Sequence, residues 1–270
     1  MRIPNFLLLD NIFKQSNKDR YYPSVVNYSL LLQKFSAISI VLILFRKIFT
    51  KFVSGKNKFP LEIAGLAGGL KIYHKTDLNG EGYNLFFDYV RAFNTAIRNP
   101  VDTILEVGAG PSYIGFLFLG LGFCKRLILA DINPEAIKVI NETIKRNNLK
   151  NVEVYLSDAL TDLPDNCCDL IVSNPVMFDE VITKKEWRVN TTTNLIASDV
   201  NWSFQKKVYK DAGRILKDNG IVFLQNNYFG GDNKKLFSKF AQDNGGRVEE
   251  IVESNPLTPE SPMYYMSIKY

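Results

Sequence analysis

Short apolar runs alternate with helix-period stretches from residue 100 onward. This alternation is typical of a parallel sheet whose strands are connected by crossover helices. The pattern predicts strands at 103–107, 126–130, 152–156, 169–173 and 220–225, and helices near 113–121, 134–147, 201–217 and 233–244.

The C-terminal pattern is different. Two strand-like runs, 246–254 and 263–270, are joined by a proline-bearing loop with no helical stretch between them. Such runs are expected to pair antiparallel at one edge of the sheet. The chain is therefore predicted to be an α/β protein, with five parallel strands followed by an antiparallel pair.

The N-terminal part is predicted to be helical. Apolar positions step by four and three along residues 28–53, which gives one wholly apolar face. Its most apolar part, 35–45, is shorter than the roughly 20 residues that a bilayer span needs. We expect the face over 31–52 to pack on the rest of the chain or on a second copy, and peripheral membrane contact is the alternative. A further helix is expected at 83–98.

The charge is unevenly distributed. Hydrophobic residues make up 46% of the chain and charged residues 23%, as expected for a folded protein. Residues 1–78 hold 12 Lys/Arg and 4 Asp/Glu, and residues 79–270 hold 21 and 24. This division predicts a basic N-terminal helical accessory region at 1–78 and a separate domain at 79–270. A basic region suits nucleic acid, an anionic membrane surface or an acidic protein, or is a solvated face without a partner.

The reactive side chains are few. Cys124, Cys167 and Cys168 lack the spacing of a disulfide framework or a zinc site, and His74 is the only histidine. No metal site and no catalysis by a histidine-activated nucleophile is therefore expected. The first ten residues have only a short apolar run, so no secretory signal is predicted, and the expected location is cytoplasmic.

The stretch ILEVGAGPSYIG, residues 104–115, turns after the first strand of the sheet. Gly108 and Gly110 allow a tight turn close to a ligand. A dinucleotide-binding fingerprint would need glycine at 113, where the chain has Tyr113. Glu106 stands two residues before Gly108, and its negative charge disfavours pyrophosphate and favours a cationic group. No nucleotide P-loop sequence occurs either. The predicted ligand is cationic and lacks phosphate.

The sequence around this turn resembles the first motif of the class I S-adenosylmethionine-dependent methyltransferases, and the resemblance extends over residues 100–270. It implies a doubly wound, Rossmann-like, seven-stranded sheet with an antiparallel last strand, preceded by the N-terminal helical extension. It also implies S-adenosylmethionine as the cofactor and residues 79–270 as the methyltransferase domain. Asp131 follows the second strand, where a carboxylate can accept hydrogen bonds from both ribose hydroxyls. Asp158 is similar to the family's acidic residue near the adenine amino group. The cofactor-binding residues that we expect are Glu106, Gly108, Gly110, Asp131, Ile132, Asp158, Ala159 and Asn174.

An Asn-Pro pair follows the fourth strand and resembles the N-P-P-[YF] motif of methyltransferases that act on adenine N6 or the glutamine amide. In that motif, oxygen acceptors bind the hydrogens of a planar NH2 group while an aromatic ring stacks on it. Asn174 and Pro175 match, but Val176 and Met177 depart from the motif, and Phe178 lies one place after the aromatic position. An Asn-Pro pair is also common in ordinary turns. Asn174, Pro175 and Phe178 are the catalytic residues that we expect.

The predicted function is methyl transfer to a planar nitrogen of a peptide, protein or nucleic acid. The stretch 196–224 also resembles glutamine methyltransferases, and the long connection 179–200 is expected to be a substrate-binding lid. One alternative is a small-molecule O- or N-methyltransferase with the N-terminal helices over the substrate. Another is a cofactor-binding partner protein without catalysis. Tyr113 disfavours a nicotinamide oxidoreductase.

Overall fold

The computed structural model describes residues 62–67, 69–74, 78, 86–176, 179, 198–228, 231–253 and 263–270. The predicted helix at 28–53, the residue Phe178 and most of the expected lid at 179–200 lie outside the described residues. The hypotheses on the apolar face over 31–52 therefore stay predictions, as does the domain boundary after residue 78. None of the helices in the described ranges has the length and apolarity that a membrane span requires.

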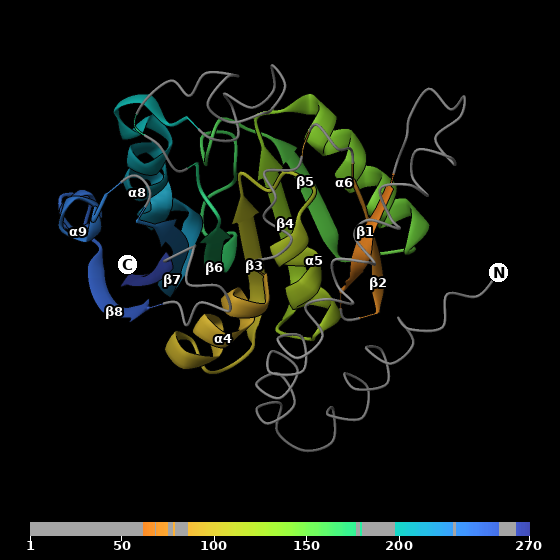
Figure 1. Cartoon of the computed structure of the whole chain (residues 1–270), viewed down its shortest axis with the longest axis horizontal. Helices are drawn as coiled ribbons and strands as arrows, with labels where there is room; N and C mark the ends of the chain where they lie inside the picture. The colour runs from red at the N-terminus through yellow and green to blue at the C-terminus, as the bar shows by residue number, and fades with distance from the viewer. Residues whose placement is uncertain are drawn as a thin grey trace, which may run out of the picture.

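The described residues form a mixed seven-stranded sheet in the order β5-β4-β3-β6-β7-β9-β8 (Figure 1). Its strands are β3 (Val101–Val107), β4 (Cys124–Asp131), β5 (Val152–Leu156), β6 (Cys168–Ser173), β7 (Leu216–Asn227), β8 (Arg247–Glu253) and β9 (Met263–Lys269). β9 lies between β7 and β8 and is antiparallel to both. The predicted parallel strands, the antiparallel pair and the antiparallel last strand are thus confirmed.

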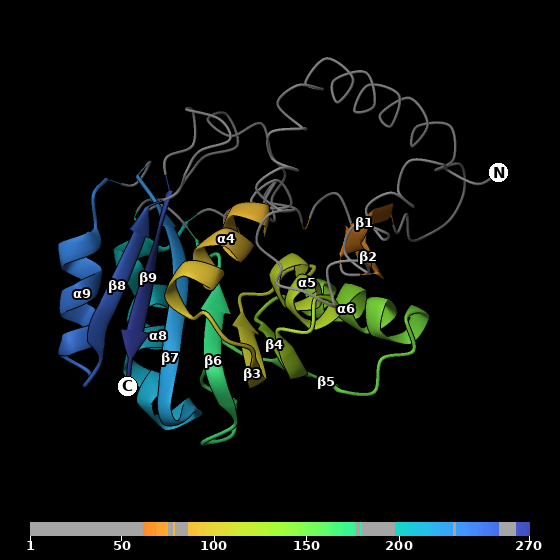
Figure 2. The same ribbon diagram turned by 90° about the horizontal axis from the view of Figure 1, so that it is seen from below.

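Helices cover both faces of this sheet (Figure 2). They are α4 (Phe86–Ala96), α5 (Tyr113–Gly120), α6 (Pro134–Arg146), α8 (Ser203–Ile215) and α9 (Lys234–Gln242), and a short 3-10 helix, η4 (Val200–Trp202), precedes α8. Buried residues of α4, α5 and α6 pack on one face of the sheet, and those of α8 and α9 pack on the other. The helices that the apolar period predicted are confirmed.

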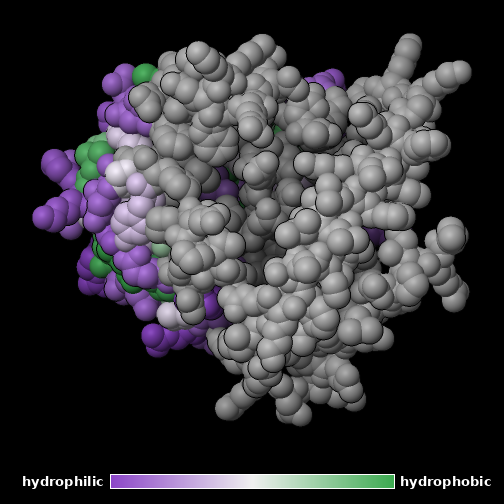
Figure 3. All heavy atoms as spheres, viewed as in Figure 1, coloured by the Kyte–Doolittle hydropathy of each residue, from purple (hydrophilic) through white to green (hydrophobic). Residues whose placement is uncertain are grey.

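The surface agrees with this burial pattern. In Figure 3, the described atoms visible over α9 and β8 are mainly hydrophilic. The large hydrophobic side chains that the structure exposes among the described residues are Ile132, Leu156, Val200 and Ile251. Ile132 directly follows β4, and Leu156 ends the neighbouring β5. Two of these apolar side chains therefore lie at the carboxyl end of the sheet.

β7 begins earlier than the sequence pattern predicts. Leu216 follows α8 directly and pairs with Cys168, whereas the apolar pattern placed the strand start at 220. The pairing register then shifts, because the next pair joins Leu170 to Ile221. Because the residues of this bulge are polar, the pattern of apolar residues does not indicate the first part of the strand.

A two-stranded hairpin, β1 (Glu62–Ala67) and β2 (Leu70–His74), was not predicted. β2 docks on α6: the Tyr73 N–H donates to Thr143 Oγ1 at 3.1 Å, and the Lys71 N–H donates to Asn147 Oδ1 at 2.9 Å. The Asn147 amide donates in return to the Lys71 carbonyl at 2.8 Å. β2, which lies within the range predicted as the accessory region, is therefore attached to the sheet domain through α6.

Tyr89 of α4 connects that helix to two strand ends. Its side chain is wholly buried. Its hydroxyl donates hydrogen bonds to the Phe223 carbonyl at 2.6 Å and to the Ser173 carbonyl at 3.0 Å. The same hydroxyl accepts a hydrogen bond from the Ser173 N–H at 3.1 Å. Tyr89 thus holds the last residue of β6, directly before Asn174.

Replacing Tyr89 by phenylalanine tests this connection. Tyr89→Phe leaves the Ser173 N–H and the Phe223 carbonyl without their buried partner, so we expect the free energy of unfolding to fall by about 1–3 kcal/mol. Urea denaturation of the full chain measures it. Tyr228→Phe is the control, because its hydroxyl bonds Glu253 at an exposed position. Equal effects of the two substitutions would contradict this role of Tyr89.

Candidate functional site

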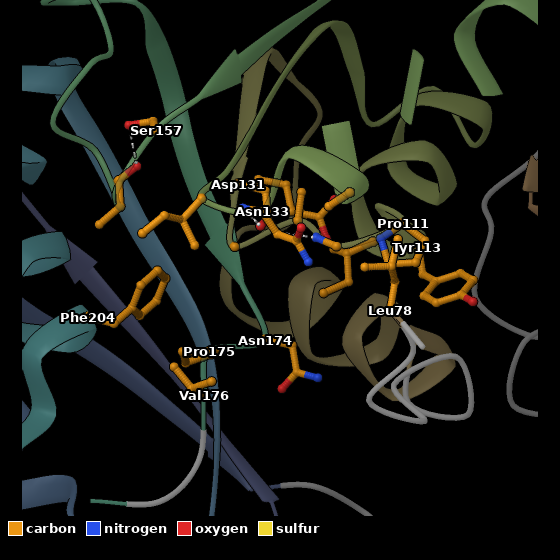
Figure 4. A pocket seen from close by; sticks show the side chains of 18 of the residues that line it. Leu78, Pro111, Tyr113, Asp131, Asn133, Ser157, Asn174, Pro175, Val176 and Phe204 are labelled. Carbon is orange, nitrogen blue, oxygen red and sulfur yellow. Dashed lines mark hydrogen bonds between the residues drawn. The ribbon is translucent and has the colours of Figure 1, made fainter. Parts of the chain in front are cut away.

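A cleft opens at the carboxyl ends of the parallel strands, where β3 has β4 on one side and β6 on the other (Figure 4). This is the topological switch point at which open α/β sheets bind their ligands. The described residues that line it are Leu78, Glu106, Gly108, Ala109, Gly110, Pro111, Tyr113, Ile114, Asp131, Ile132, Asn133, Ala136, Ser157, Asp158, Ala159, Asn174, Pro175, Val176 and Phe204. All the predicted cofactor residues are among them.

The glycine turn after β3 forms the floor of the cleft. Gly108 and Gly110 have left-handed φ angles of 63° and 51°, which side chains with a Cβ rarely adopt. A Cβ on Gly108 would also lie 3.3 Å from the ring of Phe204. Glycine at these positions therefore allows both the turn and a ligand close to its backbone.

Glu106 holds this turn against the start of α5. The side chain is 3% exposed, and its Oε2 accepts hydrogen bonds from the Ser112 hydroxyl at 2.5 Å and the Gly115 N–H at 2.8 Å. A Cβ on Gly115 would lie 2.7 Å from that oxygen, so the close approach requires glycine. Burial raises the pKa of Glu106 to about 7. The carboxyl group predicted to face a cation thus also fixes the loop that would hold it.

Ser112 and Gly115 were not assigned a role from the sequence. Both are polar partners of a carboxyl group that lies six and nine residues earlier in the chain. Their positions six and nine residues after an acidic residue near the end of a strand were the signal that could have identified them.

Asp131 joins the same turn to the end of β4. It is 9% exposed; its Oδ2 accepts the Gly110 N–H at 2.7 Å, and its Oδ1 accepts the Asn133 N–H at 2.8 Å. Burial raises the pKa of Asp131 above its usual value. Each carboxylate oxygen has a second lone pair, so the group can still accept hydrogen bonds from a ligand. Ile132 follows with half of its surface exposed toward the cleft.

Asp158 lies at the far end of the cleft and has a partner that the sequence did not predict. Its carboxylate forms an ion pair with Lys207 of α8, and both side chains are partly exposed. Ala159 is buried in a left-handed conformation with a φ of 52°. An amino group of a ligand would share Asp158 with Lys207.

The residues after β6 form the wall opposite Asp131. Asn174 is half-buried and Pro175 is buried, and both line the cleft together with Val176. Phe178, the expected aromatic residue, is outside the described ranges. Phe204, at the start of α8, supplies an aromatic ring to the cleft that the sequence analysis did not select.

The side chains fit a cationic nucleoside without phosphate. Three acidic residues line the cleft, and no lysine, arginine or histidine does so among the described residues. Phosphate sites present cationic groups or an open helix N-terminus, but here Glu106 occupies the first turn of α5. Glu106 and Asp131 would thus favour the positive charge of S-adenosylmethionine, and Ile132 and Ala159 would offer apolar contact to its base.

Residues 99–258 match the model of the protein family described as "Methyltransferase domain". The chain is similar to the ribosomal protein uL3 glutamine methyltransferase of Francisella tularensis, with 26% identity over 129 residues, which is 46% of this chain and 41% of the relative. It is 27% identical to the release factor glutamine methyltransferase of Aquifex aeolicus over 152 residues, 55% of this chain and 49% of the relative. The chain therefore spans less than half the length of these curated relatives.

Two solved structures share the fold. One is M. jannaschii TYW2 in complex with AdoMet, with a TM-score of 0.51 and 16% identity over 74% of this chain and 82% of that chain. The other is Trm5b from Pyrococcus abyssi, with a TM-score of 0.53 and 16% identity over 80% of this chain and 57% of that chain. At this identity the likeness supports the architecture alone.

The buried carboxyl group of Glu106 gives a prediction for stability. Its folded pKa of about 7 is above the usual 4.5, so its stabilising contribution is complete below pH 4.5, declines up to pH 7 and is constant above that. The free energy of unfolding of the wild type, relative to Glu106→Gln, is expected to fall by about 3 kcal/mol over this window. Urea denaturation of both proteins without cofactor measures it. A difference independent of pH would contradict the shifted pKa.

Proposed function

The chain belongs to the family of methyltransferase domains, and on that premise we propose that it transfers the methyl group of S-adenosylmethionine to a side-chain amide nitrogen of a protein. One observation carries the proposal: Asn174 and Pro175 line the same cleft as the glycine turn and the two buried carboxyl groups. A hydrogen-bond acceptor for an NH2 group thus lies beside the place suited to the cofactor. The glutamine methyltransferases among the similar proteins support a protein acceptor.

The chemistry asks little of the protein beyond alignment. S-adenosylmethionine, when bound, supplies a methyl group that its sulfonium already activates. The residues of the chain have to bring the acceptor nitrogen into line with it and exclude water. No nucleophilic side chain is required for this transfer.

Asn174 has the role of orienting the acceptor. An amide nitrogen is a weak nucleophile because its lone pair is conjugated with the carbonyl group. The Asn174 side-chain oxygen can accept a hydrogen bond from the NH2 group of the acceptor and so orient its nitrogen toward the methyl group. Tyr89 fixes the neighbouring Ser173 through its backbone N–H, so the strand end that carries Asn174 is anchored.

The motif departs from its usual form at Val176, which restores a backbone N–H where the second proline would stand. The first proline is retained and buried. The stiffness of the turn therefore comes from Pro175 and from the contact of Ser173 with Tyr89.

The acceptor class is tested by incubating the full chain with tritiated S-adenosylmethionine and extracts separated into protein, RNA and small molecules. We expect label in protein, and mass spectrometry of the labelled peptide should place the methyl group on glutamine. Label confined to RNA or to small molecules would contradict the proposal.

Removal of the Asn174 amide should separate binding from chemistry. Asn174→Ala removes an acceptor that orients the nucleophile, so we expect kcat to fall by about a hundredfold or more, with little change in the Kd of S-adenosylmethionine. Transfer rates and calorimetry measure the two quantities. Asn99→Ala, at an exposed turn, is the control. A variant that keeps most of its activity would exclude this role for Asn174.

A further inference from the structure

Phe204 is placed where the two halves of the cleft meet. Its ring atom Cζ lies 3.3 Å from the position of a Cβ on Gly108, and Ser173 Oγ lies 3.8 Å from that same point. The ring is therefore next to the glycine turn, at a point that Ser173 at the end of β6 also approaches. Figure 4 shows it pointing into the cleft from α8.

The first turn of α8 is fastened in a way that fixes this ring. Asp199, 3% exposed, accepts the Phe204 N–H at 2.6 Å through Oδ1 and the Gln205 N–H at 3.1 Å through Oδ2. Two of the four residues between Asp199 and Phe204, namely Asn201 and Trp202, have left-handed φ angles of 58° and 53°. Such angles in residues other than glycine are unfavourable and persist only where the surroundings enforce them.

A second contact anchors the same turn to the sheet. The side chain of Gln205 is 1% exposed and donates from Nε2 to Asn226 Oδ1 at 3.0 Å. Asn226 belongs to β7, the strand next to β6. The start of α8 is thus held against the carboxyl ends of the strands that flank the acceptor side of the cleft.

Phe204 differs from the other apolar residues of α8. Val208, Tyr209, Ala212 and Ile215 are fully buried against the sheet, whereas Phe204 is only partly buried and lines the cleft. If the Phe204 ring served only to pack α8 on the sheet, we would expect it to be fully buried like these four residues. Phe204 lines the same cleft as Asn174 and Pro175.

We propose that Phe204 is the aromatic surface on which the planar acceptor group stacks, opposite the amide of Asn174. This inference rests on the proposed function. The aromatic position of the motif is occupied by Met177, and Phe204 provides a ring from another element. Asp199 is a positioning residue, because it acts only through the backbone of Phe204 and Gln205.

The test compares Phe204→Leu and Phe204→Met, which keep an apolar side chain without a ring, with Phe204→Tyr, which keeps the ring. The full chain is assayed with the protein fraction that wild type labels from tritiated S-adenosylmethionine. Both ringless variants are expected to lose about tenfold or more in kcat/KM, while Phe204→Tyr stays within about threefold of wild type. The Kd of S-adenosylmethionine should stay within about threefold in all of them.

Phe240→Leu is the matched control, since Phe240 is a partly buried ring on α9 that does not line the cleft. Thermal unfolding identifies any variant that has not folded. If one ringless variant does not fold, the kcat/KM of the other decides whether the ring is needed. Unchanged kcat/KM in a folded ringless variant would overturn the inference and leave the proposed function standing. A large loss of S-adenosylmethionine affinity would overturn it as well, because the ring would then contact the cofactor. If wild type labels no protein, the proposed function fails and the inference with it.

Discussion

The site depends on one buried carboxyl group. Glu106 is buried next to the last residue of β3, and one of its carboxylate oxygens accepts hydrogen bonds from Ser112 and Gly115. These contacts hold the glycine turn and the first turn of α5 in a fixed relation to β3. Burial of a carboxylate is costly unless it is hydrogen-bonded, and this one has a raised pKa even with its donors. A cation bound close by would lower that cost. The same carboxyl group would therefore both hold the turn and favour a positively charged ligand.

The second carboxyl group extends the same construction across the sheet. Asp131 binds the Gly110 N–H from the end of β4, so the turn after one strand is tied to the next strand. On the other side, Tyr89 binds the end of β6, and Asp199 fixes the start of α8 over it. One side of the cleft is thus organised by acidic groups that accept hydrogen bonds from backbone amides, and the side next to Asn174 by Tyr89 and by Asp199 at the start of α8.

Much of the fold could be predicted because each element carries a strong periodic pattern. The strands from β3 to β6 are short apolar runs, and the sequence between β8 and β9 carries no helical period. The hairpin at 62–74 was missed because its glycines interrupt the alternation of apolar and polar residues. The early start of β7 was missed because its bulge is polar.

The acidic and glycine residues that line the cleft could be predicted because each lies at or just after the carboxyl end of a strand, and the carboxyl ends of parallel strands meet at one edge. Phe204 and Lys207 could not, because both belong to a helix that is distant in the sequence and carries no motif for the site. From that helix, Phe204 lines the cleft and Lys207 pairs with Asp158. The ion pair of Lys207 with Asp158 also changes the surroundings of a predicted residue. Such contacts depend on the packing of α8 against the sheet, which a local pattern does not encode.

The central claim is that the cleft binds a cationic nucleoside without phosphate. Calorimetric titration of the purified full chain with S-adenosylmethionine, and separately with NAD and ATP, tests it most directly. The account predicts saturable heat of binding with S-adenosylmethionine and none with the two phosphate compounds. Binding of either phosphate compound, with no heat from S-adenosylmethionine, would contradict it.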